Sequence, residues 1–116
     1  MRKMRGLPDR PPTTHVAIGN TDDRLSQLRW HEFVGAVDTA VRRHGEPIYG
    51  FWVSPSAEPY QNAAWAFQPR TVADRDALRA ELARVAGDFD QDSVAWNESE
   101  TELLRPSGET EPLFPL

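Results

Sequence analysis

Asp88, Asp90 and Asp92 alternate along the chain with the spacing that opens a calcium-binding loop. Carboxylates at alternate positions lie on one side of an extended turn, which is what an oxygen-ligated cation requires. A complete loop also has glycine at its sixth position and glutamate at its twelfth, where this chain has Ser93 and Ser99. We therefore interpret the segment as a solvated turn at the end of a helix and expect no metal site.

The spacing of the histidines, His15, His31 and His44, also argues against a metal centre. Paired ligands on a helix stand about four positions apart with an acidic partner, whereas His31 and Glu32 are adjacent and diverge around the helix. His44 comes at the end of a predicted helix, where a cation offsets the helix dipole. The chain has no cysteine, which excludes thiolate catalysis, iron–sulfur clusters and cysteine-ligated zinc. We expect no cofactor.

Aromatic and amide side chains close together could instead form a small-molecule pocket. The candidates are Trp52, Tyr60, Asn62 and Trp65, because Tyr60 and Asn62 enter a predicted strand beside the two tryptophans. Tryptophan is also frequent at interfaces, since it combines a large area with one hydrogen-bond donor. Trp65 falls on a core-facing pattern, so an ordinary core with one interface tryptophan is the other interpretation.

The six residues from Ile48 to Val53 (IYGFWV) predict a strand that is apolar on both faces. Strict alternation would place Tyr49, Phe51 and Val53 on one face and Ile48 and Trp52 on the other, and both faces cannot turn toward helices. An exposed apolar face is normally covered by a partner. We therefore predict that Tyr49, Phe51, Trp52 and Val53 form an interaction face, with a second copy of the chain or another protein as partner.

Hydrophobic periodicity predicts the elements that position these residues. Ser26 caps a first helix that ends before Gly45, with the glycine in the left-handed conformation, and Thr71 with Asp74 opens a second helix. The order is β-α-β-β-α-β, which is typical of an α+β, ferredoxin-like fold (split βαβ) with a four-stranded antiparallel sheet and two helices on one face. The predicted strands are His15–Asn20, Ile48–Val53, Asn62–Gln68 and Ser93–Glu98, and the predicted helical stripes are Trp30, Phe33, Val34, Val37 and Val41, then Leu78, Leu82, Val85 and Phe89.

The length of 116 residues fits one domain. We expect residues 1–14 to be a flexible, basic, proline-rich tail, residues 15–104 to be a single ferredoxin-like domain, and residues 105–116 to be an acidic, proline-rich tail. Leu113, Phe114 and Leu116 are apolar residues within the second tail. Two interpretations stay open for them: a disordered end, or a short segment that docks on a partner or folds back on the sheet.

The net charge of −5 disfavours a nucleic-acid partner. An RNA-binding sheet of this topology needs exposed aromatic residues and a basic surface, whereas the residues predicted to face outward are His15, Ala17, Ala64 and Ala66. No apolar run approaches the roughly 18 residues of a membrane span, and the basic N-terminus lacks the apolar segment of a signal peptide. We expect a cytoplasmic protein without a membrane partner.

Three segments resemble small uncharacterised bacterial and phage proteins of GC-rich hosts: Gly19–Gln27 (GNTDDRLSQ), Gln61–Phe67 (QNAAWAF) and Gln91–Trp96 (QDSVAW). This resemblance implies no activity and no functional residue. The order of elements is also similar to that of cofactor-independent dimeric α/β-barrel enzymes, in which two sheets pack face to face.

We therefore expect a non-enzymatic interaction or regulatory module that acts as a homodimer through an apolar sheet face, with no catalytic residue. The alternative is a small cofactor-independent enzyme or small-molecule-binding domain of the dimeric α/β-barrel type. An assembled pocket around Trp52, Tyr60, Asn62 and Trp65 would favour this alternative.

Overall fold

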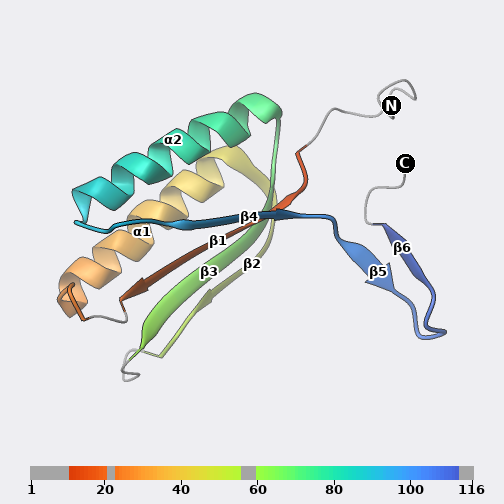
Figure 1. Ribbon diagram of the computed structural model, residues 1–116, viewed down its shortest axis with the longest axis horizontal. Helices are drawn as coiled ribbons and strands as arrows, with labels where there is room; N and C mark the ends of the chain where they lie inside the picture. Colours follow the sequence, from red (N-terminus) through yellow and green to blue (C-terminus); the bar gives the residue numbers. More distant parts are fainter. Residues whose placement is uncertain (1–10, 21–22, 56–59, 113–116) are drawn as a thin grey trace.

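The computed structural model describes residues 11–20, 23–55 and 60–112 (Figure 1). Its helices are α1 (Gln27–His44) and α2 (Val72–Asp88), and its strands are β1 (Thr13–Asn20), β2 (Gly45–Val53), β3 (Gln61–Pro69), β4 (Ala95–Ser99), β5 (Glu102–Leu104) and β6 (Thr110–Pro112). Four strands form an antiparallel sheet in the order β2-β3-β1-β4, while β5 and β6 form a separate two-stranded sheet. The expected α+β class, with two helices and a four-stranded antiparallel sheet, is confirmed.

Both helices begin at the capping residues that the sequence indicates. The hydroxyl of Ser26 accepts a hydrogen bond from the Arg29 N–H (3.2 Å), and that of Thr71 accepts one from the Asp74 N–H (3.0 Å). The Thr71 hydroxyl also donates to the Asp74 carboxylate at 3.1 Å, so one side chain fixes the first turn of α2 twice. No helix in the described part of the chain is both long and apolar enough to cross a membrane.

The core lies between the two helices and one face of the sheet. The rings of Phe33 and Phe89 stack with 5.1 Å between their centroids, which ties α1 to the end of α2. Val34 is the one residue of the predicted α1 stripe that is only half-buried. The buried residues of the core include Val16, Ile18, Trp30, Phe33, Val37, Val41, Ala63, Trp65, Phe67, Leu78, Leu82 and Val85.

A buried group of amides attaches the start of α1 to β3. Asn20 donates to the Leu25 carbonyl (3.0 Å) and to Gln61 Oε1 (3.2 Å), and its own Oδ1 accepts from the Leu25 N–H (2.9 Å). Gln61 also exchanges two hydrogen bonds with Gln27, at 2.8 and 2.9 Å. These contacts supply the partners that buried polar groups need.

The junction between α1 and β2 corrects one prediction. The helix ends at His44 as expected, but Gly45 has a φ of −113°, which is extended and not left-handed. Glycine is required for another reason: an added Cβ would lie 2.8 Å from Phe67 Cδ2 and 3.0 Å from the Val41 carbonyl oxygen. Helix α1 therefore ends because the chain passes directly into an edge strand that packs tightly against its last turn.

Strand β2 does not keep the strict alternation expected of it. Its pairing with β3 slips twice near its start. Ile48 consequently pairs on the helix-facing side, together with Phe51 and Val53. Trp52 pairs with Ala64 on the opposite side. The expectation that Ile48 and Trp52 share one face is wrong, because a bulge moves the residues beyond it to the other side of the strand.

The boundaries of the body also differ from those expected. Strand β1 begins at Thr13 and not at His15, and the amide of Gln68 donates to the carbonyl of Pro11. The four-stranded sheet ends at Ser99. Residues 102–112, which span the expected domain boundary, form the β5–β6 hairpin, so part of the expected tail is a strand. Residues 1–10 and the apolar segment 113–116 lie outside the described residues.

Candidate functional site

The face of the sheet that turns away from the helices is the main candidate site. Figure 1 shows α1 and α2 on the same side of the sheet, and the strand register identifies the residues on the other side, which we call the open face. None of the following positions is Asp, Glu, Lys or Arg, although 27% of the chain is charged. The open face consists of Gly50 and Trp52 from β2, Asn62, Ala64, Ala66 and Gln68 from β3, Thr13, His15, Ala17 and Gly19 from β1, and Ala95, Asn97 and Ser99 from β4. Thr13, Ala66 and Gln68 are buried within the single chain, at the end of the sheet where β1 begins.

One row across the open face combines a large side chain with three small ones. Trp52 pairs with Ala64, Ala64 with Ala17, and Ala17 with Ala95, so the row crosses the whole sheet. The Trp52 side chain is 57% exposed. It folds back over Gly50, where an added Cβ would lie 2.3 Å from Cη2 of the indole. The row therefore presents a broad ring at the β2 edge and a flat alanine floor over the remaining strands.

The structure divides the predicted interaction face between two sides of β2. Tyr49, Phe51, Trp52 and Val53 are all exposed, but only Trp52 lies on the open face. Phe51 and Val53 turn to the helix side, where the Phe51 ring stacks on Trp65 with 5.1 Å between centroids. Tyr49 lies in the bulge between two paired positions. The four residues therefore form an exposed aromatic edge of the sheet, and not a single face.

The structure does not assemble the expected pocket. Trp65 is fully buried on the helix side, and its indole N–H donates to Asp38 of α1 at 2.9 Å. Trp52 and Asn62 lie on the opposite side of the sheet. Asn62 contacts Tyr60 instead, through a hydrogen bond from its side-chain amide to the Tyr60 carbonyl (3.1 Å). The expectation that the two tryptophans share a pocket is wrong, since the pairing of β1 with β3 directs Trp65 into the core.

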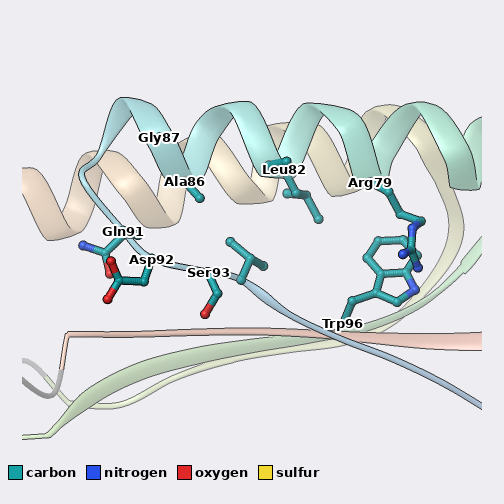
Figure 2. Close-up of a pocket in the computed structure, with 10 residues that line it drawn as sticks. Arg79, Leu82, Ala86, Gly87, Gln91, Asp92, Ser93 and Trp96 are labelled. Atoms are coloured by element: carbon teal, nitrogen blue, oxygen red, sulfur yellow. The ribbon is translucent and has the colours of Figure 1, made fainter.

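A cleft that the sequence reasoning missed lies between α2 and β4. It has a volume of about 400 Å³. Figure 2 shows α2 above the segment that leads into β4, with the side chains of both lining the space between them. The signal in the sequence is the run of small residues on this flank of α2, which keeps the helix from filling the space. The lining residues are Arg79, Leu82, Ala83, Ala86, Gly87, Gln91, Asp92, Ser93, Val94 and Trp96.

Charged groups close one end of this cleft. The Arg79 guanidinium lies 5.2 Å from the centre of the Trp96 ring. Figure 2 shows the two side chains next to each other at this end of the cleft. Glu98 accepts a hydrogen bond from the Trp96 indole at 2.9 Å and lies 3.7 Å from Arg75 and 4.0 Å from Arg79. The cleft therefore has an apolar interior, and the charge at this end is already balanced between its own side chains.

His44 occupies a second polar cluster, between the two helices. Its Nδ1 lies 2.9 Å from Asp74 and its Nε2 lies 3.2 Å from Glu81, which also contacts Arg43. The ring therefore lies between two carboxylates of α2, with one ring nitrogen directed at each. The sequence predicted only a cation at the end of α1, since the approach of α2 cannot be read from a local pattern.

The charges around His44 shift the pKa of both acids. The hydrogen bond from His44 holds the pKa of Asp74 below its ordinary value, against the opposing effect of burial. Burial raises the pKa of Glu81, but hydrogen bonds from Arg43 and His44 lower it by more, so its pKa also lies below the ordinary value. The cluster joins α1 to α2 through ionised groups.

The remaining predicted polar residues lie apart from these sites. His15 is exposed on the open face and His31 is exposed on α1. Asp88 ends α2, and Asp92 lies 3.8 Å from Arg24. Among the described residues, no group of three or more histidine or acidic side chains is arranged to hold a metal ion.

No known protein family matches the chain, and no curated protein matches it in sequence. The geometry of the open face and of the cleft is therefore what supports a function.

Proposed function

We propose that this chain is a ferredoxin-like interaction module that forms a homodimer through its open face. The strand order β2-β3-β1-β4, with each helix connecting two strands of one antiparallel sheet, supports the ferredoxin-like assignment. Dimerisation covers the exposed ring of Trp52 and the alanine floor beside it. The result is a two-layered sheet with the helices outside.

The absence of charge on the open face carries this proposal. The chain has a net charge of −5, so two copies repel each other over most of their surfaces. The described positions of the open face hold small, amide and aromatic residues, together with one histidine. Depletion of charge with retention of aromatic area is the composition found at the centre of protein interfaces. Of all partners, a second copy offers this same surface by symmetry.

The alanine row also defines how two copies fit. A two-fold axis parallel to the strands places β2 of one copy over β4 of the other and keeps like ends of the two sheets together. Because Trp52 and Ala95 stand at opposite ends of one row, each Trp52 ring then lies over the Ala95 of the partner copy. A large side chain thus packs on a small one twice in the same interface.

A charge placed in the centre of the row tests the proposal. Ala17 is exposed in the single chain, so Ala17→Arg leaves the folded monomer intact but places two desolvated cations in the dimer. Sedimentation equilibrium should show a dimer for the unchanged chain and at least a hundredfold weaker association for Ala17→Arg. Ala80→Arg, on the exposed side of α2, is the matched control and should still form dimers. Equal association of both variants would contradict the proposal.

The cleft between α2 and β4 supports the alternative, a small-molecule-binding domain of the dimeric α/β-barrel type. Its volume of about 400 Å³ is within the range of ligand sites. Its charged residues, however, are engaged with neighbours: Arg79 with Trp96 and Glu98, and Asp92 with Arg24. We therefore favour the interaction module over the ligand-binding domain.

A further inference from the structure

The β5–β6 hairpin, residues 102–112, is an arm that extends beyond the end of the sheet (Figure 1). The backbone of Arg105 closes its turn: its N–H donates to the Glu109 carbonyl and its carbonyl accepts from the Gly108 N–H, each at 2.8 Å. Gly108 has a φ of +93°, which favours glycine at this position. An ion pair between Arg105 and Glu111 links the two strands. The arm thus has a defined shape of its own.

The arm is exposed over nearly its whole length. Each of its residues is exposed except Glu111, which is half-buried. Leu103 and Leu104 are 42% and 76% exposed. A two-stranded hairpin is marginally stable in water unless a further surface packs on it. Leucines at this position therefore indicate a surface that covers them in the assembled protein.

The arm starts at the border of the open face. Strand β4 ends where Ser99 pairs with Thr13, and the arm begins three residues later. Strand β2 begins at the same end of the sheet, because Gly45 pairs with Pro69 at the end of β3. The two-fold arrangement proposed above keeps like ends together and lays β4 over β2. It therefore brings the arm of one copy to the start of β2 on the other.

The area of the open face favours such an addition. The strands have 8, 9, 9 and 5 residues, and with a spacing of about 4.8 Å and a rise of about 3.3 Å per residue their flat footprint is roughly 500 Å². Stable interfaces bury about 800 Å² of accessible surface on each partner. The open face is thus a small surface for a stable dimer, and the adjoining arm supplies more surface on each copy.

Charge also favours contact between the arm and the start of β2. The arm carries Glu102, Glu109 and Glu111 against a single Arg105. Arg42 and Arg43, in the last turn of α1, are already paired with Asp38 and Glu81. The side chain of Arg70 is 41% exposed, and its contact with the exposed Glu46 is 3.5 Å long. The ring of Tyr49, within β2, is also exposed. An acidic hairpin with two leucines fits an aromatic surface beside an exposed arginine.

We propose that the arm of one copy packs on the start of β2 of a second copy, with Leu103 and Leu104 against Tyr49 and the arm's glutamates toward Arg70. This inference rests on the proposed homodimer, because a monomer has no second β2 edge to hold. The paired arms then lock the two copies together at one end of the sheets.

Photo-cross-linking between isotopically distinct copies tests the arm. The ¹⁴N-labelled variant Leu104→p-benzoylphenylalanine is mixed with the unchanged ¹⁵N-labelled chain, irradiated and digested with trypsin. We expect the light arm peptide to be joined to the heavy peptide 44–70, which contains β2, and fragmentation should place the link at or beside Tyr49. A link to a light peptide of the same chain, a link to another heavy peptide, or no link between copies of a dimeric protein would overturn the inference.

A second measurement separates failure of the arm from failure of the dimer. The double variant Leu103→Ser/Leu104→Ser changes exposed side chains outside the core, so the body stays folded. We expect its dimer to dissociate at least tenfold more readily, while the turn variant Ser107→Ala dimerises like the unchanged chain. Unaltered dimerisation of the leucine variant would reject the arm and leave the open-face dimer standing. An unchanged chain that sediments as a monomer would reject the proposed function itself.

Discussion

His44 shows how one residue acquires its state from an element distant in sequence. The ring belongs to the last turn of α1, but its two partners, Asp74 and Glu81, both belong to α2. Because the ring contacts both of these carboxylates, it ties together the two helices that cover the sheet. The lowered pKa of each acid is the measurable consequence of this arrangement.

The cluster predicts how stability depends on pH. A carboxyl group whose pKa is lower in the folded than in the unfolded state stabilises the fold above its unfolded pKa, and this contribution is lost as the pH falls through the folded pKa. We expect the free energy of unfolding, measured with urea, to decrease from pH 6 to about pH 3.5. In the double variant Asp74→Asn/Glu81→Gln the decrease should be smaller, because the two titrating groups are gone.

The control for this experiment removes two acids that are more exposed. Asp76 and Asp92 have side chains that are 63% and 91% exposed, and neither contacts His44. The variant Asp76→Asn/Asp92→Asn should therefore keep the acid sensitivity of the unchanged chain. If the variant Asp74→Asn/Glu81→Gln lost as much free energy of unfolding at low pH as the unchanged chain, the cluster would not be a source of the pH dependence.

The junction between α1 and β2 carries a prediction at the scale of elements. Gly45→Ala brings a methyl group to 2.8 Å from Phe67 and 3.0 Å from the backbone of Val41, and the backbone oxygen cannot rotate away. We expect a loss of about 1–3 kcal/mol in the free energy of unfolding. Gly35→Ala, within α1 and with no atom within 4 Å of the added Cβ, should instead stabilise the chain by about 0.5–1 kcal/mol. Equal effects of the two changes in thermal or chemical unfolding would refute this reading of the junction.

The elements with one clear hydrophobic period could be predicted from the sequence. The apolar residues of α1 recur at helical spacing and Ser26 supplies the cap, so only one helix with one buried face fits the pattern. These residues are Trp30, Phe33, Val37 and Val41. In the same way, the alternation of apolar residues in β3 predicted which of its side chains turn toward the helices. Strand β2 differs because it is apolar on both sides, so no alternation selects the register and a bulge decides it.

The hairpin and the candidate site depended on information that no local pattern contains. Strands of three residues are too short to show a period, so no pattern separates β6 from a polar tail or marks β5, at the end of the expected domain, as part of a hairpin. The expected pocket with Trp52 and Trp65 is not formed, because β3 pairs with β1, which is distant in sequence, and this pairing directs Trp65 into the core. The cleft depends on the spacing between α2 and β4, which only tertiary packing determines.

At the scale of the whole molecule, charge, shape and area favour the same assembly. The acidic surface keeps single copies apart, while the uncharged open face and its Trp52–Ala95 row provide the one matched contact that we identify. The arms extend that contact at one end of the sheet. In the proposed dimer the two sheets lie face to face, and the helices, which cover one side of each sheet (Figure 1), lie outside.

An isotope-filtered nuclear Overhauser experiment on a mixture of labelled and unlabelled copies tests this assembly most directly. One copy carries ¹³C in its alanine methyl groups and the other is unlabelled. Because each Trp52 ring lies over the partner's Ala95 in the proposed dimer, we expect filtered cross-peaks between the Trp52 indole protons and the Ala95 methyl group. A spectrum with no cross-peak between copies, at concentrations where the unchanged chain is fully associated, would contradict the open-face dimer.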